Sequence, residues 1–250
     1  MPRPAAGTTA VRGIGTRGGV IVHTLTSLAW LNLARLELRR LCSVCEWAVI
    51  VDAVTGLTKT ELRAEILLAR RTLAPQLHDA EAHALCGHLP AFIGAGETVC
   101  AYVPVGSEPG SAELIDSLLR RGVRVLLPVA RHDAAGLPVP LQWGEYHPGC
   151  LVQARFGLRE PAEPWLSVDA IAVATVVLVP ALAVDRTGVR LGRGAGFYDR
   201  SLPLAAPTAR LVAVVRDDEL VDRLPSEPHD VRMTHALTPN RGLVAFGSRE

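Results

Sequence analysis

Short apolar runs alternate with amphipathic stretches from residue 58 onward, and this alternation limits the possible folds more than any other feature. The apolar runs cover residues 99–105, 123–129, 169–180 and 209–215. Helical patterns occupy 58–76 and 111–122, and a further helix is expected to begin near Phe197. Strands that alternate with helices predict an α/β fold, with a mostly parallel sheet and helices on both faces. In such folds, ligands bind beyond the carboxyl ends of the strands.

Size and charge restrict the cellular setting and the partners. The chain has 250 residues, of which 49% are apolar, so it can bury a substantial core. Its formal net charge of +1 gives no overall field to attract nucleic acid or an anionic membrane. The apolar stretch 170–184 is shorter than the ~20 residues of a membrane span. Five scattered cysteines indicate reduced thiols. We therefore expect a cytoplasmic protein without nucleic-acid or membrane partners.

The first 57 residues differ from the rest of the chain. They contain no acidic residue before Glu37, although four arginines and the apolar stretch 19–34 lie there. A targeting segment, a small helical appendage and an extension without a folded role all agree with this pattern. Secretion is least favoured, because the sequence RLELRRLC follows the apolar stretch in place of a small-residue cleavage site. We favour a dispensable extension over residues 1–57, followed by a single α/β domain over residues 58–250.

Two short patterns in this extension resemble known sites. GIGTRG at 13–18 matches the G-x-G-x-x-G pattern of dinucleotide-binding loops, and Glu37 follows at about the 20-residue spacing of a ribose-binding acid. The preceding residues form a poor strand, so a flexible glycine-rich segment is the favoured interpretation. CSVC at 42–45 has redox or zinc spacing, but it lacks a second such pair or a close pair of histidines. Neither pattern predicts a site.

The stretch TKTELRAEILLARRTLAPQ opens the predicted domain. Thr58 and Glu61 have the spacing of a capping box, in which both side chains bond to free backbone amides of the first turn. Apolar residues at helical spacing form one face: Leu62, Ile66, Ala69 and Leu73. Basic residues form another face: Lys59, Arg63 and Arg70. The helix pattern alone indicates that this basic face is solvated. Lys59 is the only lysine of the chain.

The stretch RLGRGAGFYDR, residues 190–200, follows a predicted buried strand. It places glycines at alternate positions: Gly192, Gly194 and Gly196. Bare backbone can approach a ligand closely and present successive N–H groups, and the helix that follows adds its positive end. Arg190 and Arg193 add charge, so the loop is typical of an anion site, above all for phosphate. Asp199 would repel phosphate unless a cation such as Mg²⁺ lies between them.

A second interpretation of this stretch is a glycine-rich turn with a helix-capping acid, and the glycines alone favour it. Two arginines, the rings of Phe197 and Tyr198 and the acid Asp199 lie directly alongside. Together these side chains favour a binding site over a simple turn. No Gly-Lys-Ser/Thr sequence follows, so the stretch is not a Walker loop.

Five segments of the chain match, in order, a pattern found in one protein family. They are KTELR (59–63), YVPVGSEPGSAELI (102–115), FGLREP (156–161), PALAVDRTGVRLGRGAGFYDR (180–200) and LPSEPHDVRM (224–233). These segments resemble the 5-formyltetrahydrofolate cyclo-ligases, also called 5,10-methenyltetrahydrofolate synthetases. The resemblance covers about residues 59–246 and leaves the first 57 residues aside. It implies an architecture similar to that of NagB, RpiA and the CoA transferases.

The resemblance also implies an activity, that of an ATP-dependent ligase of one-carbon metabolism. The implied reaction is the Mg²⁺-dependent cyclisation of 5-formyltetrahydrofolate to 5,10-methenyltetrahydrofolate, with release of ADP and phosphate. The implied partners are a reduced folate and ATP, and a monomer is favoured over an oligomer. Phosphoryl transfer of this kind depends on positioning and charge neutralisation, so a Ser–His or Cys–His pair is not required.

Individual residues receive roles from the same resemblance. The implied catalytic residues are Lys59, Arg193 and Asp199. The implied ATP-binding residues are Lys59, Arg63, Arg190, Leu191, Gly192, Arg193, Gly194, Ala195, Gly196, Phe197 and Tyr198. The implied folate-binding residues are Val103, Glu108, Phe156, Arg193 and Phe197. The implied Mg²⁺ ligands are Asp199 and Asp230.

Four positions depart from the family pattern. Phe197 stands in place of a tyrosine, Ala195 of a lysine found in some members, Val184 of a phenylalanine, and Thr234 of a frequent acid. At Phe197 a hydroxyl contact is lost while the ring is kept. These departures keep two alternatives open. One is a non-catalytic nucleotide- or folate-binding protein, and the other is a sugar-phosphate or CoA-handling enzyme on the same fold.

Overall fold

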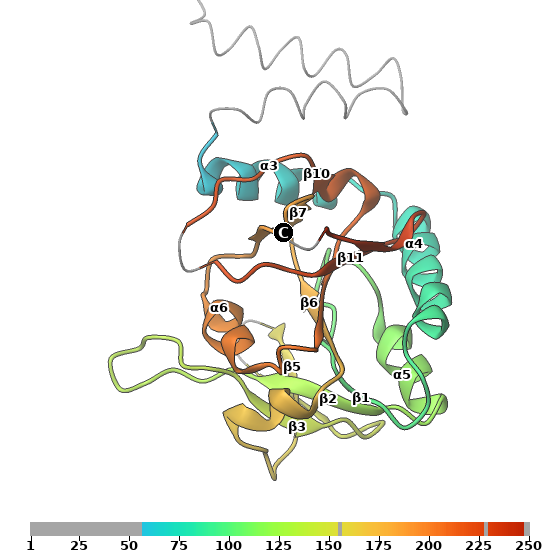
Figure 1. Cartoon of the computed structure of the whole chain (residues 1–250), viewed down its shortest axis with the longest axis vertical. Helices are drawn as coiled ribbons and strands as arrows, with labels where there is room; N and C mark the ends of the chain where they lie inside the picture. The colour runs from blue at the N-terminus through green and yellow to red at the C-terminus, as the bar shows by residue number, and fades with distance from the viewer. Residues whose placement is uncertain (1–56, 155–156, 228–229, 248–250) are drawn as a thin grey trace, which may run out of the picture. The chain divides into compact units, whose positions relative to one another are not determined.

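The computed structural model describes residues 57–154, 157–227 and 230–247, and a seven-stranded sheet forms its centre (Figure 1). In sheet order the strands are β12 (Gly242–Ala245), β11 (His235–Thr238), β9 (Arg210–Val214), β6 (Val176–Pro180), β1 (Thr98–Cys100), β2 (Arg124–Val129) and β3 (Gln142–Glu145). The neighbours from β11 to β2 run parallel, while the edge strands β12 and β3 are antiparallel. The predicted α/β fold with a mostly parallel sheet is confirmed. The closer likeness to NagB, RpiA and the CoA transferases stays a prediction.

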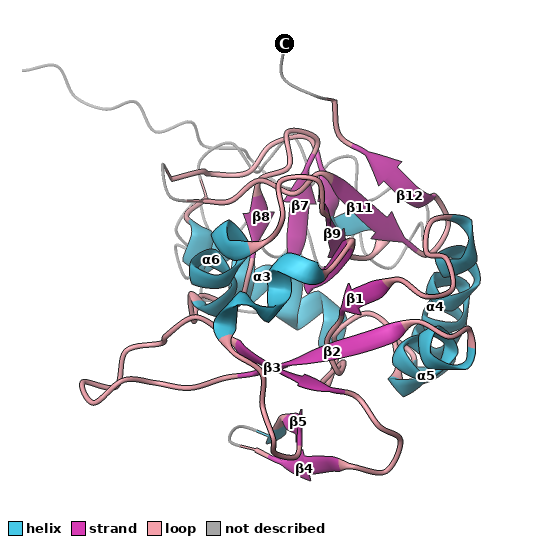
Figure 2. Cartoon of the chain, turned by 60° about the horizontal axis from the view of Figure 1, so that its bottom comes forward, coloured by secondary structure: helices cyan, strands magenta, loops and turns pink. Residues whose placement is uncertain are grey.

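Helices cover both faces of this sheet (Figure 2). One face carries α4 (Pro75–His88), the 3-10 helix Leu89–Ala91 and α5 (Ala112–Arg120). The other face carries the 3-10 helix Val168–Val173, α6 (Phe197–Ser201) and the 3-10 helix Leu202–Leu204. Successive residues of a strand point to opposite faces, so Val99 packs with α5 and Cys100 packs on the other side. The central strands β1, β2, β6 and β9 are therefore mostly apolar beyond their first residues, because helices cover both faces of the sheet there.

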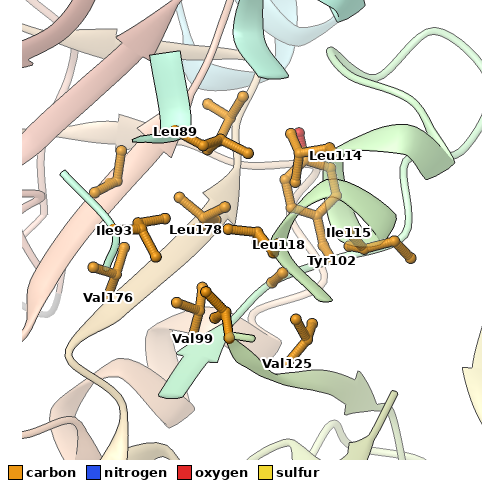
Figure 3. Packing of buried hydrophobic residues seen from close by; sticks show 14 of the residues in the cluster. Leu89, Ile93, Val99, Tyr102, Leu114, Ile115, Leu118, Val125, Val176 and Leu178 are labelled. Carbon is orange, nitrogen blue, oxygen red and sulfur yellow. The ribbon is translucent and has the colours of Figure 1, made fainter. Parts of the chain in front are cut away.

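The core between α5 and the sheet shows how the helices are held in place (Figure 3). Leu114, Ile115 and Leu118 lie on one side of α5, and all three are fully buried against Val99 and Val125. Full burial of one such side chain contributes about 1.5–3 kcal/mol. The apolar face of α5, rather than helix propensity, thus fixes this helix on the sheet.

Two smaller sheets complete the described strands. The first contains β10 (Leu220–Val221), β7 (Ala183–Asp185) and β8 (Arg190–Leu191), in that order. The second is the hairpin of β4 (Leu151–Gln153) and β5 (Arg159–Pro161). The helix α3 (Lys59–Arg71) packs on the first of them through a small apolar cluster. This packing places α3 beside the glycine stretch, residues 192–196, because β8 leads directly into it.

The start of α3 agrees with the predicted capping box. The Oγ1 atom of Thr58 accepts a hydrogen bond from the backbone N–H of Glu61 at 3.3 Å. The backbone N–H of Thr58 in turn donates to Oε2 of Glu61 at 2.8 Å. Leu62 and Ile66 are buried in the cluster that contains Leu191. The cap and the cluster together fix the first turns of α3 beside β8.

The prediction of a solvated basic face is wrong for Arg70. Its side chain is 2% exposed, and its Nε and Nη2 atoms donate to the carboxylate of Glu219 at 2.6 and 2.7 Å. Its Nη2 also donates to the backbone oxygen of Ala181 at 2.6 Å. Burial raises the pKa of Glu219, and the neighbouring guanidinium opposes that rise. The last turn of α3 is thus tied to the 3-10 helix Asp217–Glu219 and to the end of β6.

The first predicted strand is shorter than its apolar run. The run covers 99–105, but β1 ends at Cys100. The hydroxyl of Tyr102 donates to the backbone oxygen of Pro109 at 2.6 Å, so the chain folds back on itself directly after the strand. A continuous apolar run indicates that a segment is buried. It does not show at which residue the hydrogen bonds to the neighbouring strands end.

The third predicted strand is also shorter. The run covers 169–180, but β6 begins at Val176 and a 3-10 helix occupies Val168–Val173. Both pieces are rich in apolar residues, so periodicity could not separate them. Between β2 and β3, residues 130–141 contain one isolated antiparallel β-bridge, which joins His132 and Pro138.

The predictions for the N-terminal extension fall on residues 1–56, outside the described part of the chain. They concern the extension itself, the glycine pattern at 13–18 with Glu37, and the cysteine pair at 42–45. Among the residues that the structure does describe, no helix has both the length and the apolar character needed to cross a membrane.

Candidate functional site

A cavity of about 890 Å³ lies where the start of α3, the glycine stretch after β8 (residues 192–196) and the residues 225–227 and Asp230 meet. Its described lining residues are Thr58, Lys59, Thr60, Arg63, Arg190, Gly192, Gly194, Gly196, Asp199, Arg200, Pro225, Ser226, Glu227 and Asp230. The volume lies within the range of small-molecule binding sites. Three segments that are far apart in the sequence therefore form one candidate binding site, which we call the nucleotide cavity after the ligand proposed for it below.

The glycine stretch adopts backbone conformations that other residues rarely tolerate. Gly194 has a φ of 95°, and Gly196, the N-cap of α6, has a φ of 78°. A side chain on Gly192 would place its Cβ only 2.8 Å from Nη1 of Arg190. Arg63 approaches the stretch from α3, and its Nε donates to the backbone oxygen of Gly192 at 2.9 Å. The missing side chains thus allow two guanidinium groups to lie against the backbone.

Arg190 is the most buried cation of the cavity. Its side chain is 6% exposed, and its Nη2 donates to Oδ1 of Asp199 at 2.7 Å. Its guanidinium carbon lies 5.5 Å from the ring centre of Tyr198. The contacts of this one side chain hold the first turn of α6 against β8.

Two buried donors at this position have no hydrogen-bond partner among the described residues. They are Nε of Arg190 and the hydroxyl of Tyr198. Burial raises the pKa of Tyr198, so its hydroxyl keeps its proton and remains a donor. A buried donor without an acceptor costs about 1–3 kcal/mol. An oxygen-rich ligand in the cavity could remove that cost for Arg190, which lines it.

Lys59 forms an ion pair with Asp230. The Nζ atom lies 2.9 Å from Oδ2 and 3.3 Å from Oδ1 of this aspartate, and 3.6 Å from Oε2 of Glu227. The side chains of Lys59 and Asp230 are 18% and 12% exposed. Both carboxylates that the resemblance assigns to Mg²⁺ therefore contact a basic side chain: Asp230 contacts Lys59, and Asp199 contacts Arg190.

The described residues contain no group of three or more His, Cys, Asp or Glu side chains that could hold a metal ion. Mg²⁺ commonly keeps several waters and binds through one or two carboxylates together with phosphate oxygens. Asp199 and Asp230 line the same cavity. This pair of carboxylates therefore fits an ion that arrives with a phosphate-bearing ligand.

Arg193 connects the glycine stretch to a second group of predicted residues. Its Nε lies 3.0 Å from Oε1 of Glu108, and the other carboxylate oxygen accepts the backbone N–H of Val105 at 3.0 Å. The Glu108 side chain is 13% exposed. Val103, in the same loop, packs against the core under α4 and α5. The glycine stretch therefore contacts α3 through Arg63 and the loop after β1 through Arg193.

The structure does not place all of the predicted residues in the lining of the cavity. Leu191 is 2% exposed and packs in the cluster with Leu62 and Ile66, so its side chain does not line the cavity. Six other predicted residues also lie outside the lining: Val103, Glu108, Arg193, Ala195, Phe197 and Tyr198. The ring of Phe197 meets that of His132 edge to face, with centres 5.2 Å apart. Phe156 lies outside the described residues.

Six lining residues had no role assigned from the sequence: Thr58, Thr60, Arg200, Pro225, Ser226 and Glu227. The sequence pattern assigned Thr58 only to the helix cap, and this assignment gave no indication that the residue also lines a cavity. The other five lie inside segments that resemble the family. Their neighbours Lys59, Asp199 and Asp230 were therefore the signal that could have identified them.

Comparisons with known proteins agree with these segments. The model of the 5-formyltetrahydrofolate cyclo-ligase family matches residues 56–239. A 5-formyltetrahydrofolate cyclo-ligase from Mycolicibacterium smegmatis is 63% identical over 189 residues, which are 76% of this chain and 97% of the relative. The protein of the same name from Escherichia coli K12 is 31% identical over 176 residues, which are 69% of this chain and 95% of the relative.

Two solved structures share the fold. The 5,10-methenyltetrahydrofolate synthetase of Aquifex aeolicus has a TM-score of 0.64 at 22% identity and covers 78% of this chain and 95% of its own. The synthetase of Mycoplasma pneumoniae has a TM-score of 0.55 at 19% identity and covers 71% of this chain and 96% of its own. Because both identities are below 25%, these two structures support only the shared fold. The match to the family model and the two relatives show that the chain belongs to the 5-formyltetrahydrofolate cyclo-ligase family.

Proposed function

We propose that the chain catalyses the ATP- and Mg²⁺-dependent cyclisation of 5-formyltetrahydrofolate to 5,10-methenyltetrahydrofolate, with release of ADP and phosphate. The observation that carries the proposal is the nucleotide cavity, in which Lys59, Arg63 and Arg190 meet bare glycine backbone and the carboxylates of Asp199 and Asp230. Cations and backbone amides suit phosphate groups. Membership of the cyclo-ligase family indicates which reaction would use such a site.

The reaction must convert a formyl oxygen into a leaving group. Transfer of the γ-phosphoryl group of ATP to that oxygen activates the formyl carbon, and N10 of the folate then attacks it. Phosphate departs with the formyl oxygen, and N10 loses its proton to water. Such chemistry depends on positioning and charge neutralisation more than on covalent chemistry by the protein. A cavity lined by cations and backbone amides suits this requirement.

Lys59 and Arg63 would contact the phosphates. Lys59 would exchange its contact with Asp230 for phosphate oxygens, since both groups line the cavity. The Nε atom of Arg63 already bonds to Gly192, which leaves the terminal nitrogens of its guanidinium for the ligand. Removing one well-placed donor from a transition state typically costs about 3 kcal/mol.

Asp199 and Asp230 would hold Mg²⁺ together with the nucleotide. Neutralisation of phosphate charge is the chemistry that the bound ion supplies. Arg190 and Lys59 currently contact these two carboxylates, so both cations would become available to phosphate oxygens when the ion is bound. The Nε atom of Arg190, which has no hydrogen-bond partner among the described residues, is a further donor of a residue that lines the cavity.

The folate would lie on the other side of the glycine stretch, near Glu108, Arg193 and Phe197. The carboxylate of Glu108 is mostly buried and can accept hydrogen bonds from the N–H edges of a pterin. Phe197 offers a ring for stacking, although it lacks a hydroxyl. Because Arg193 pairs with Glu108, this arginine is placed to link the folate side to the phosphate side.

An absorbance assay tests the proposed activity directly. Purified protein with Mg²⁺, ATP and 5-formyltetrahydrofolate should develop the near-ultraviolet absorbance of the methenyl product. Reactions without ATP or without Mg²⁺ are the controls, and both should stay unchanged. If both ligands bind but the absorbance does not change, the protein is a nucleotide- and folate-binding protein and the proposed enzyme activity is wrong.

We further propose that residues 58–250 form the catalytic domain and act as a cytoplasmic monomer, while residues 1–57 are dispensable. In support, the family model begins its match at residue 56. The 189 matched residues cover 97% of the M. smegmatis relative, which leaves little of that protein to correspond to the extension. A chain lacking residues 1–57 should fold and keep its turnover in the absorbance assay. An inactive but folded product would contradict this proposal.

A further inference from the structure

A second cavity adjoins the nucleotide cavity, and none of the roles proposed above uses it. Its volume is about 800 Å³. The turn between β7 and β8 lines it, together with the segments 223–226, 232–235 and 245–247. Ser226 lines both cavities, so one segment forms a wall between them. We call this space the basic cavity, for the reason given next.

Positive charge dominates the described lining of the basic cavity. Arg186, Arg223 and Arg232 come from different segments, and Asp185 is the single acid among the described lining residues. An arginine guanidinium keeps its charge at any physiological pH and presents five N–H donors. The lining therefore suits an anion with more than one charged group.

Asp185 does not pair with these arginines, because its carboxylate accepts hydrogen bonds from neighbouring segments of the chain. Its side chain is buried, and its Oδ1 accepts hydrogen bonds from the backbone N–H and the hydroxyl of Thr187, both at 2.8 Å. The same oxygen accepts the backbone N–H of Val189 at 3.0 Å. Its Oδ2 accepts the backbone N–H of Leu224 at 3.0 Å. Four donors of the protein thus use both carboxylate oxygens.

Each of the three arginines, in contrast, has N–H groups that make no hydrogen bond to a described residue. Arg232 is held by Thr187, since its Nη1 donates to the backbone oxygen at 3.0 Å and to the hydroxyl at 2.7 Å. Its remaining N–H groups make no hydrogen bond to a described residue. Arg186 pairs with Asp222 at 2.8 Å, but the two side chains are 60% and 71% exposed, and exposed pairs are weak. Arg223 makes no hydrogen bond or ion pair with the described residues.

We propose that the basic cavity is a second anion-binding site, for a small polyanion that carries two or more phosphate or carboxylate groups. Arginine binds either group through two parallel hydrogen bonds. One arginine is held in place and two can turn, so the cavity can close on anionic groups at different spacings. Met233 and Phe246 supply an apolar wall that excludes water from one side of these contacts.

The chain provides a specific reporter for this site. It has two methionines, Met1 and Met233, and Met233 lines the basic cavity but not the nucleotide cavity. The full-length protein labelled with ¹³C-methyl methionine therefore has one methyl signal from the basic cavity. Titration with inorganic pyrophosphate, and separately with citrate, should shift this signal until it saturates.

Matched variants separate the two cavities. The double substitution Arg186→Gln/Arg223→Gln should weaken the affinity measured at Met233 by at least about tenfold, because two charge-assisted bonds are lost. Arg63→Gln removes a cation from the nucleotide cavity and should leave that affinity within about twofold. Both arginines of the double variant are exposed, so its fold should persist. A Met233 signal that is unchanged before titration verifies this.

A stronger response to pyrophosphate assigns the site to phosphates, and a stronger response to citrate assigns it to carboxylates; either result supports the proposal. The proposal is overturned if the Met233 signal does not move at about 10 mM of either anion. This concentration is about ten times the dissociation constant of a site that binds with a Kd of about 1 mM. The proposal is also overturned if Arg63→Gln weakens the response as much as the double substitution does. Neither measurement depends on cyclo-ligase activity.

Discussion

The two ends of α3 carry basic side chains in opposite surroundings. Lys59, in the first turn, is 18% exposed and contacts Asp230 in the lining of a cavity. Arg70, in the last turn, is 2% exposed and contacts Glu219 inside the fold. The first pair can exchange its partner for a ligand, whereas no ligand can reach the second. The basic residues of one helix therefore include a structural anchor and a cation that lines a cavity, and substitutions at the two ends should have different consequences.

The largest expected effect is on stability, at the buried end. Arg70→Met should lower the free energy of unfolding by about 3–5 kcal/mol, because it leaves the buried carboxylate of Glu219 without its cation. Urea unfolding measures this change. As a control, Arg70→Met/Glu219→Leu should recover most of the loss, since a buried ion pair can be replaced by apolar side chains. If Arg70→Met is as stable as the native protein, the ion pair at the buried end of α3 does not stabilise the fold, and the proposed difference between the two ends is wrong.

A smaller free-energy effect, on turnover, is expected at the cavity end. Lys59→Met should reduce the rate of methenyl formation by about 10²–10³-fold, the usual cost of one lost donor in a transition state. Its free energy of unfolding should change by less than about 1 kcal/mol, because the ion pair with Asp230 is partly exposed. Initial rates and urea unfolding together test this split. Full activity in Lys59→Met would show that the lysine has no role in the reaction.

The smallest expected effect is at the helix cap. Thr58→Ala should lower the free energy of unfolding by about 1 kcal/mol, because the backbone N–H of Glu61 loses its acceptor. Thr58→Ser keeps a hydroxyl and should behave like the native protein. Turnover should fall by less than about threefold if Thr58 acts only on the helix. A large loss of turnover at unchanged stability would instead mean that its hydroxyl contacts the ligand.

Local patterns allowed the start of α3 to be predicted correctly. Thr58 and Glu61 lie three positions apart, and a capping box needs nothing beyond that spacing. The parallel sheet was also predictable, because alternation of strands and helices leaves few other arrangements. The burial of Arg70 could not be predicted in this way. Its partner Glu219 lies 149 positions away in the sequence, and only the folded chain brings the two together.

The candidate site shows the same limit. The resemblance identified Lys59, Arg63, the glycines and Asp230, which line one cavity. It could not show that Leu191, between two such residues, turns its side chain into the core. The basic cavity had no sequence signal either. Its three arginines, Arg186, Arg223 and Arg232, belong to no common pattern and meet only through the tertiary fold.

The position of the one lysine has a practical consequence. A chain with a single lysine has a single side-chain amine, and here that amine lies in the nucleotide cavity. Amine-directed reagents therefore have two targets on the whole protein, the α-amino group and Lys59. Mass spectrometry can follow the labelling of Lys59 with and without ATP, and protection would report occupancy of the cavity without any measurement of catalysis. By the same reasoning, acylation of this lysine inside a cell would act at one position only, directly on the ion pair with Asp230.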